Sequence, residues 1–175
     1  MPAAADEPLW RCPDCGQSFV TRNLPHSCAV QGLDEHFAGA AAALRETFDA
    51  LLDAVQALGP VTVNATRSRI TFQTRIRYAG IDAPRGDRLL ANFVLTRPVR
   101  SERVARVEHV PPYYYVHRVR LARPDDVDAE LRAWLAEARQ VGDRRHVTDP
   151  DWPRERQPPH WVRVPGAGAQ PRSAS

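Results

Sequence analysis

The chain contains no lysine, and all 24 of its basic residues are arginines. This absence excludes lysine-dependent chemistry, such as a phosphate-loop lysine, a Schiff-base lysine or the catalytic lysine of nucleases. The sequence also lacks the Gly-x-Ser-x-Gly, His-Glu-x-x-His and glycine-rich phosphate-loop motifs of common enzyme classes. A GC-rich genome is the simplest cause of the arginine bias. Together these absences favour a protein without enzymatic activity.

The sequence also lacks long apolar segments, and its cysteines are too few and odd in number for a disulfide framework. No apolar run approaches the roughly 20 residues of a membrane span, and residues 1–8 lack the basic and apolar regions of a secretory signal. The three cysteines are an odd number, clustered near a histidine, which favours metal binding in a reducing compartment over disulfides. We therefore expect a cytoplasmic protein. A length of 175 residues with 43% hydrophobic residues allows one domain plus small extras.

The first thirty residues contain a cluster of metal-binding residue types, in the spacing C-x2-C-x10-H-x-C. Its members are Cys12, Cys15, His26 and Cys28. Thiolate sulfur and imidazole nitrogen are preferred ligands of Zn²⁺, and a structural zinc takes four of them in a tetrahedron. In an extended segment, His26 and Cys28 point to the same side and can reach one ion. The spacing predicts a structural zinc knuckle over residues 9–31, hereafter the knuckle, preceded by a disordered start at residues 1–8.

Other interpretations of this cluster remain open. Phe19 and Leu24 are similar to the apolar positions of a DNA-reading finger with two cysteines and two histidines, but Pro25 disfavours the helix that such a finger needs. His36 is a possible fourth ligand in place of His26. A decayed site with isolated buried thiols and a redox Cys-x-x-Cys pair are the remaining alternatives.

Hydrophobic periodicity changes twice along the chain. A helical stripe runs over residues 33–58, with a possible break at Gly39 and an end at Gly59-Pro60. Period-two alternation and apolar runs then predict strands, and a second helix is expected from about Pro124 to Val141. The strand candidates cover residues 61–63, 70–78, 89–97, 103–110 and 114–121, with a loop at 80–87. This order predicts an α+β domain over residues 32–142, in which N- and C-terminal helices flank an antiparallel sheet of about four strands.

Positive charge is concentrated in the expected sheet. Residues 66–123 hold 13 arginines against four acidic residues, a net charge of +9, whereas the rest of the chain carries −6. We expect Arg75 and Arg77 to share one strand face, and Arg118 and Arg120 to share another, with the tyrosines at 113–115 nearby. Arginine forks bind phosphates and tyrosine rings stack on bases, so nucleic acid is the first candidate among anionic partners. The alternative is a solvated face balanced by acidic helices.

Two further functions compete with nucleic-acid binding. One is a small-molecule-binding or hydrolytic cleft near Arg75, Arg77, His109 and His117, although His117 is better explained as a strand residue bonded to a neighbour. The other is a protein–protein adaptor acting through the proline- and arginine-rich tail at residues 143–175, which contains Trp152 and Trp161. We expect this tail to pack back on the domain, with its last ten residues disordered.

Several segments of the chain resemble one family, known as the domain of unknown function 5655 family, in its form with an N-terminal zinc-finger-like leader. The resemblance covers about residues 10–142 and is most distinctive in the leader. It implies an α+β domain of cytoplasmic bacterial proteins without established activity, suggests Cys12, Cys15, His26 and Cys28 as ligands, and supplies no catalytic residues. The segments that carry it are 10–19, 23–28, 36–39, 58–61, 75–78, 115–117, Asp128 and 134–138.

Overall fold

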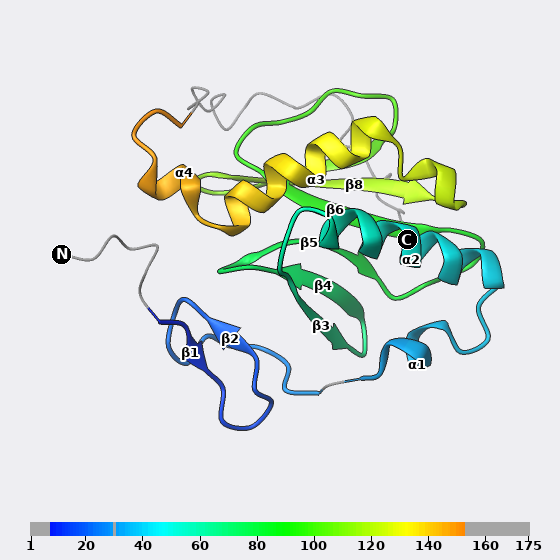
Figure 1. Ribbon diagram of the computed structural model, residues 1–175, viewed down its shortest axis with the longest axis horizontal. Coiled ribbons are helices and arrows are strands. Elements are labelled where there is room, and N and C mark those ends of the chain that lie inside the picture. Colours follow the sequence, from blue (N-terminus) through cyan, green and yellow to red (C-terminus); the bar gives the residue numbers. More distant parts are fainter. Residues whose placement is uncertain (1–7, 30, 153–175) are drawn as a thin grey trace, which may run out of the picture.

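The computed structural model describes residues 8–29 and 31–152, and it shows a six-stranded sheet, a small hairpin and four α-helices (Figure 1). All strand pairs are antiparallel, and the large sheet has the order β3-β4-β5-β6-β8-β7. The small sheet pairs β1 (Trp10–Arg11) with β2 (Ser18–Phe19). The other strands are β3 (Thr62–Thr66), β4 (Arg69–Gln73), β5 (Arg77–Asp82), β6 (Leu89–Leu95), β7 (Val104–Val110) and β8 (Tyr114–Leu121). The helices are α1 (Leu33–Phe37), α2 (Ala42–Gln56), the 3-10 turn η1 (Pro124–Asp126), α3 (Ala129–Gly142) and α4 (Arg145–Thr148).

The α+β class is confirmed, but the sheet is larger than the predicted four strands. The segment 70–78, expected as one strand, is split into β4 and β5 by a turn at residues 74–76. The backbone N–H groups of Arg75 and Ile76 both donate to the carbonyl of Gly142 at the end of α3, at 3.2 and 3.0 Å. Apolar and polar residues continue to alternate through the turn, so the sequence pattern is that of one continuous strand. The turn is evident only from the backbone contact with α3. Residues 80–82, expected in a loop, extend β5.

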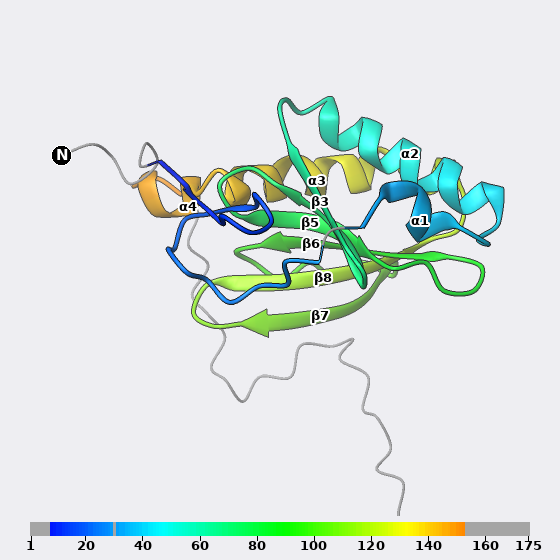
Figure 2. The same cartoon turned by 90° about the horizontal axis from the view of Figure 1, so that it is seen from below.

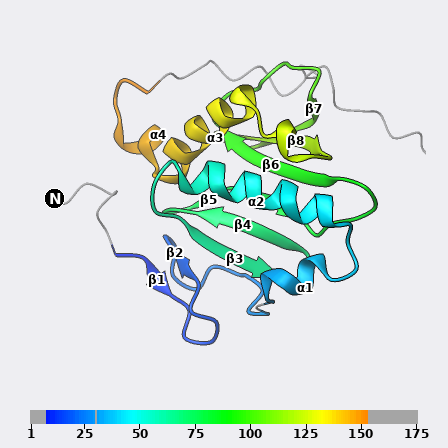
Figure 3. The ribbon, with the colours of Figure 1, turned by 45° about the vertical axis from the view of Figure 1, so that its right-hand side comes forward.

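The two long helices cover one face of the sheet (Figure 3). The apolar stripe of α2 places Phe48 and Leu51 in the core, where Phe48 stacks on Phe72 of β4 at 6.3 Å. On α3, Trp134 stacks on Phe93 of β6 at 5.3 Å. The expected break between two helices is present, because α1 ends before Gly39, which has φ +79°, a conformation that favours glycine. No helix within residues 8–29 and 31–152 is long and apolar enough to cross a membrane.

The second long helix begins later than its sequence pattern suggested. Pro124 starts a short 3-10 turn, and α3 begins only at Ala129. The reason is the capping residue: Asp128 accepts the N–H of Leu131 at 3.0 Å, which satisfies one of the free donors of the first turn. The carboxylate of Asp126 instead accepts the N–H of Ala122 at 2.7 Å.

The face of the sheet opposite the helices, hereafter the open face, is defined by strand alternation (Figure 2). In β8, Tyr115, His117, Val119 and Leu121 are buried toward the core, as the alternation predicted. Val116, Arg118 and Arg120 therefore lie on the open face. Register pairs Arg118 with Asn92 of β6 on one side and with Arg106 of β7 on the other.

Candidate metal centre and arginine-lined surface

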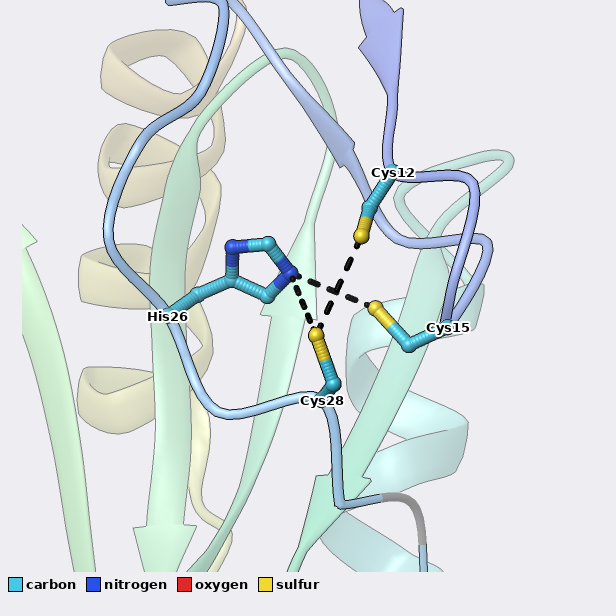
Figure 4. Close-up of side chains that lie close together, drawn as sticks. All are labelled: Cys12, Cys15, His26 and Cys28. Carbon is cyan, nitrogen blue, oxygen red and sulfur yellow. Dashed lines mark hydrogen bonds between the residues drawn. The ribbon is translucent and has the colours of Figure 1, made fainter.

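The structure brings all four predicted metal ligands together in the knuckle (Figure 4). Their ligand atoms lie within 4.8 Å of one another. The Sγ atoms of Cys12 and Cys28 are 3.9 Å apart, and the Nε2 atom of His26 lies 3.3 Å from Sγ of Cys15 and 3.4 Å from Sγ of Cys28. A tetrahedral zinc with its usual bond lengths spaces two sulfurs by about 3.8 Å, and a sulfur and a nitrogen by about 3.6 Å. The donor set and its spacing therefore fit one tetrahedral metal ion.

The β1–β2 hairpin positions the first two cysteines. The N–H of Cys12 donates to the carbonyl of Gln17 at 2.8 Å, and the N–H of Gly16 donates to the carbonyl of Cys12 at 2.9 Å. Gly16 has φ +72°, which a glycine adopts without a steric penalty. The backbone N–H of Cys15 lowers the pKa of the Cys12 thiol to about 7. The turn thus favours the thiolate, which is the form that binds a metal.

His26 is oriented as a ligand by its other ring nitrogen. Its Nδ1–H donates to the carbonyl of Leu24 at 2.7 Å, which leaves Nε2 as the unprotonated nitrogen facing the sulfurs. The ring also lies 4.4 Å from the ring of Phe19 and 6.4 Å from that of Trp10. His36, the alternative ligand, is buried in α1 and is not a member of the cluster. The geometry therefore favours His26.

The knuckle docks against the β3 and β4 side of the sheet (Figures 1 and 3). Gln73 of β4 donates from Nε2 to the carbonyl of Ser18 at 2.5 Å. Arg77 of β5 donates from Nη2 to Oε1 of Gln17 at 2.8 Å, and its guanidinium lies 5.5 Å from the centre of the Phe19 ring. Burial lowers the pKa of Arg77, with a further contribution from the positive charge of Arg69. Arg77 therefore holds the knuckle on the sheet.

The four arginines expected to form one anion-binding surface lie in two places. Arg75 and Arg77 are at the turn that joins β4 to β5. Arg118 and Arg120 are on β8, and Arg118 donates to the carboxylate of Asp82 at 2.8 Å. Because register pairs Asp82 with Arg69 at the far end of β4, Arg118 reaches toward the end of the sheet opposite Arg77.

A hollow of about 460 Å³ lies at this far end of the open face. Of its lining residues, only Arg120 is a site residue predicted from the sequence. The signal it missed is the segment Arg85-Gly86-Asp87-Arg88, a two-residue turn in which Gly86 has φ +69°. An isolated antiparallel bridge pairs Arg85 directly with Arg88. The lining includes Ser68, Arg69, Arg85, Arg88, Leu90 and Arg120, together with Asp82.

The histidines considered for a catalytic cleft do not meet the arginines. His117 is fully buried on the helix-covered face, where it accepts the N–H of Val99 at 2.9 Å and stacks on Phe93 at 5.0 Å. Burial lowers its pKa to about 4, so it is neutral at physiological pH. His109 is exposed on β7 and stacks on Tyr115 at 4.6 Å. Arg77 faces the knuckle instead, so His117 and Arg77 do not share a cleft.

The tyrosines and the start of the tail lie near the other end of β8. Tyr113 is 57% exposed, Tyr115 is buried, and the hydroxyl of Tyr114 lies 3.1 Å from Nε2 of His146. Trp152 donates from Nε1 to the hydroxyl of Thr96 at 2.9 Å, so the tail packs on the domain at least to this residue. Trp161 and the last ten residues lie outside the described part of the chain.

Comparison with known protein families identifies a match for most of the domain. The profile of a family described as "Domain of unknown function (DUF5655)" matches residues 33–141. The matched segment contains α1 to β8 and nearly all of α3, and it begins after the knuckle. Curated proteins and solved structures give no match.

Proposed function

The chain belongs to the DUF5655 family, and from this premise we propose that it is a cytoplasmic, non-enzymatic binding protein for an anionic partner, nucleic acid first. One observation supports this proposal above the others. The hollow at the end of the open face is lined by four arginines and one acidic residue, Asp82. That acid is already bound by Arg118.

Cross-strand pairing places arginines opposite one another. Arg85 lies opposite Arg88, and Arg106 lies opposite Arg118, so two pairs of like charges face one another across strands. Acidic side chains pair with Arg88, Arg106 and Arg118, but none pairs with Arg85 within the described residues. Like charges directly opposite each other destabilise a sheet. A bound anion removes this repulsion, and arginine forks match phosphate oxygens well. Arg85, which has no acidic partner within the described residues, is therefore better explained by an anionic ligand than by the stability of the fold.

Within the same proposal, the metal centre is a structural zinc site. Four protein ligands leave no open coordination position, which is the pattern of structural rather than catalytic zinc. When bound, zinc would cross-link the hairpin that carries Cys12 and Cys15 to the segment that carries His26 and Cys28. The knuckle so held presents Gln17, Ser18 and Phe19 to the sheet.

The alternative functions have less support. A small-molecule or hydrolytic site near Arg75, Arg77 and His117 has no shared cleft. An adaptor that acts through a free tail would need exposed tryptophans, whereas Trp152 is bonded to Thr96. We therefore give priority to the anionic partner.

Nucleic-acid binding is tested by titrating fluorescent single-stranded DNA, duplex DNA and RNA with the full chain at rising salt. We expect binding that weakens steeply with salt, because each phosphate contact releases a counterion. Arg106→Ala should lower the salt slope by about one contact, whereas Arg100→Ala, an exposed arginine beyond the far end of β6, should not change it. Absence of binding to every probe at low salt would refute the proposed partner.

Metal analysis of protein purified without chelator tests the zinc site independently. We expect about one zinc per chain, and much less in Cys12→Ser. Protein that is folded but carries no zinc would remove this part of the proposal.

A further inference from the structure

We propose that the hollow beside Arg85 and Arg120 recognises a phosphate monoester, that is, a terminal phosphate group and the unit that carries it. This inference rests on the proposed function and deepens it, since it names the part of the anionic partner that enters the hollow. It selects chain ends over the continuous phosphodiester backbone.

Three separate segments supply the basic residues of the hollow. Arg69 follows the β3–β4 turn, Arg85 and Arg88 border the turn between β5 and β6, and Arg120 lies near the end of β8. The N–H of Ala83 donates to the carbonyl of Ser68 at 2.8 Å and joins the two turns. Arginines from three segments therefore line one hollow, where a single anion could contact more than one of them.

The charge balance of the hollow favours a dianion. Arg88 is held by Asp87 through bonds of 2.9 and 3.2 Å, and Asp82 is taken by Arg118. Within residues 8–29 and 31–152, Arg69, Arg85 and Arg120 form no ion pair with an acidic side chain. A phosphate monoester carries a charge of about −1.5 to −2 at pH 7 on three terminal oxygens, whereas a diester carries about −1. Three uncompensated arginines match the monoester better.

The size and the remaining lining agree with a phosphate that is attached to a larger unit. A volume of about 460 Å³ exceeds the needs of inorganic phosphate and falls among those of small-molecule sites. Leu90 and Ala83 add apolar surface, and Ser68 adds a hydroxyl. This combination suits a sugar or nucleoside that follows the terminal phosphate.

The test compares oligonucleotides of one sequence with a 5′-phosphate, a 3′-phosphate or hydroxyl ends, with a mononucleotide and inorganic phosphate as competitors. We expect one phosphorylated end to bind about tenfold more tightly than the hydroxyl-ended strand. The preference should disappear in Arg85→Ala and in Arg120→Ala and persist in Arg100→Ala. Thermal unfolding of each variant verifies that it is folded, and Arg85→Lys tests whether charge without the planar fork suffices.

The possible outcomes separate this inference from the proposed function. Equal binding of phosphorylated and hydroxyl-ended strands overturns the terminal-phosphate site but leaves nucleic-acid binding intact. Binding of the mononucleotide alone, sensitive to Arg85→Ala, supports the monoester site and overturns nucleic acid as its source. An unchanged preference in both alanine variants shows that the phosphate lies elsewhere and overturns the inference.

Discussion

At the scale of single residues, arginine side chains have different roles on one sheet. Arg77 is partly buried between the open face and the knuckle, Arg118 is paired with Asp82, and Arg120 faces the hollow. Their neighbours in sequence do not distinguish them, since each belongs to an Arg-x-Arg segment, Arg75 to Arg77 or Arg118 to Arg120. The segment that covers each position determines its role.

Removing the Arg77 side chain should loosen the knuckle. Arg77→Ala loses the bond to Gln17 and the contact with the Phe19 ring, and we expect a loss of about 1–2 kcal/mol in the free energy of unfolding. Urea unfolding measures this loss, and the rate of zinc extraction by a chelator should rise with it. Arg100→Ala is the matched control. If Arg77→Ala has the same free energy of unfolding and the same rate of zinc extraction as Arg100→Ala, Arg77 does not hold the knuckle.

His117 should make the fold sensitive to mild acid. Burial lowers the pKa of His117 to about 4, whereas a histidine in the unfolded chain has a pKa of about 6.5. Between these values the unfolded state binds more protons, so stability is full above about pH 6.5 and falls as the pH approaches 4, by on the order of 3 kcal/mol. His117→Gln should flatten the dependence of the free energy of unfolding on pH in this range. His109→Gln, at an exposed position, should retain the pH dependence of the unaltered chain. If His117→Gln also retains it, His117 is not the group responsible.

At the scale of elements, strand β5 depends on a close approach of backbones at Gly80. A Cβ at this position would overlap the carbonyl oxygen of Ile70 and lie 3.0 Å from Cα of Thr71 on β4. Both groups belong to the backbone and cannot move aside alone. Glycine is thus required inside this strand, and the reason is the pairing of β4 with β5.

Gly80→Ala should therefore destabilise the sheet by about 2–3 kcal/mol. The matched control is Gly32→Ala, since Gly32 has φ −67° and a Cβ there meets only the side chain of Glu35 at 3.8 Å. Thermal and urea unfolding of the two variants would reveal the difference. Equal stability would mean that β4 and β5 are less closely apposed than described.

Most elements were predictable from local patterns, and the errors occurred where a distant segment intervenes. The stripe of α2 and the alternation of β8 are local properties and were predicted with nearly correct bounds. The turn at 74–76 was missed because it is held by the carbonyl of Gly142. The start of α3 was placed too early because Pro124 and Asp128 both carry start signals, and only Asp128 caps the helix.

At the scale of the whole molecule, the knuckle and the sheet form a coupled unit. Gln31 donates its N–H to the carbonyl of Ala65 at 3.1 Å, and Gln73 reaches back to Ser18, so the knuckle is joined to the edge strand β3 and to its neighbour β4. Asn64 and Gln73 are bonded to each other at 3.0 Å and are buried on this side. Metal in the knuckle should therefore protect β3 and β4.

Metal removal should expose this side of the sheet selectively. We expect a chelator to increase amide hydrogen exchange in β3 and β4 while leaving β6 and β8 protected, because loss of the proposed metal would free the segments that it joins. Cys28→Ser should behave in the same way without chelator, and added zinc should restore protection only in the unaltered chain. Unchanged exchange in β3 and β4 would show that the knuckle docks without metal.

The sequence by itself determined the four cysteine and histidine residues that form the candidate metal cluster, the amphipathic helices and the side of β8 that faces the core. These depend on spacings of a few residues, which backbone geometry translates directly into direction. Tertiary structure alone decided that Arg77 serves the knuckle, that His117 is enclosed, and that Arg69, Arg85, Arg88 and Arg120 meet around one hollow. The physical reason is that periodicity reports which face a residue occupies, whereas exposure and charge compensation depend on distant segments that cover or border that face.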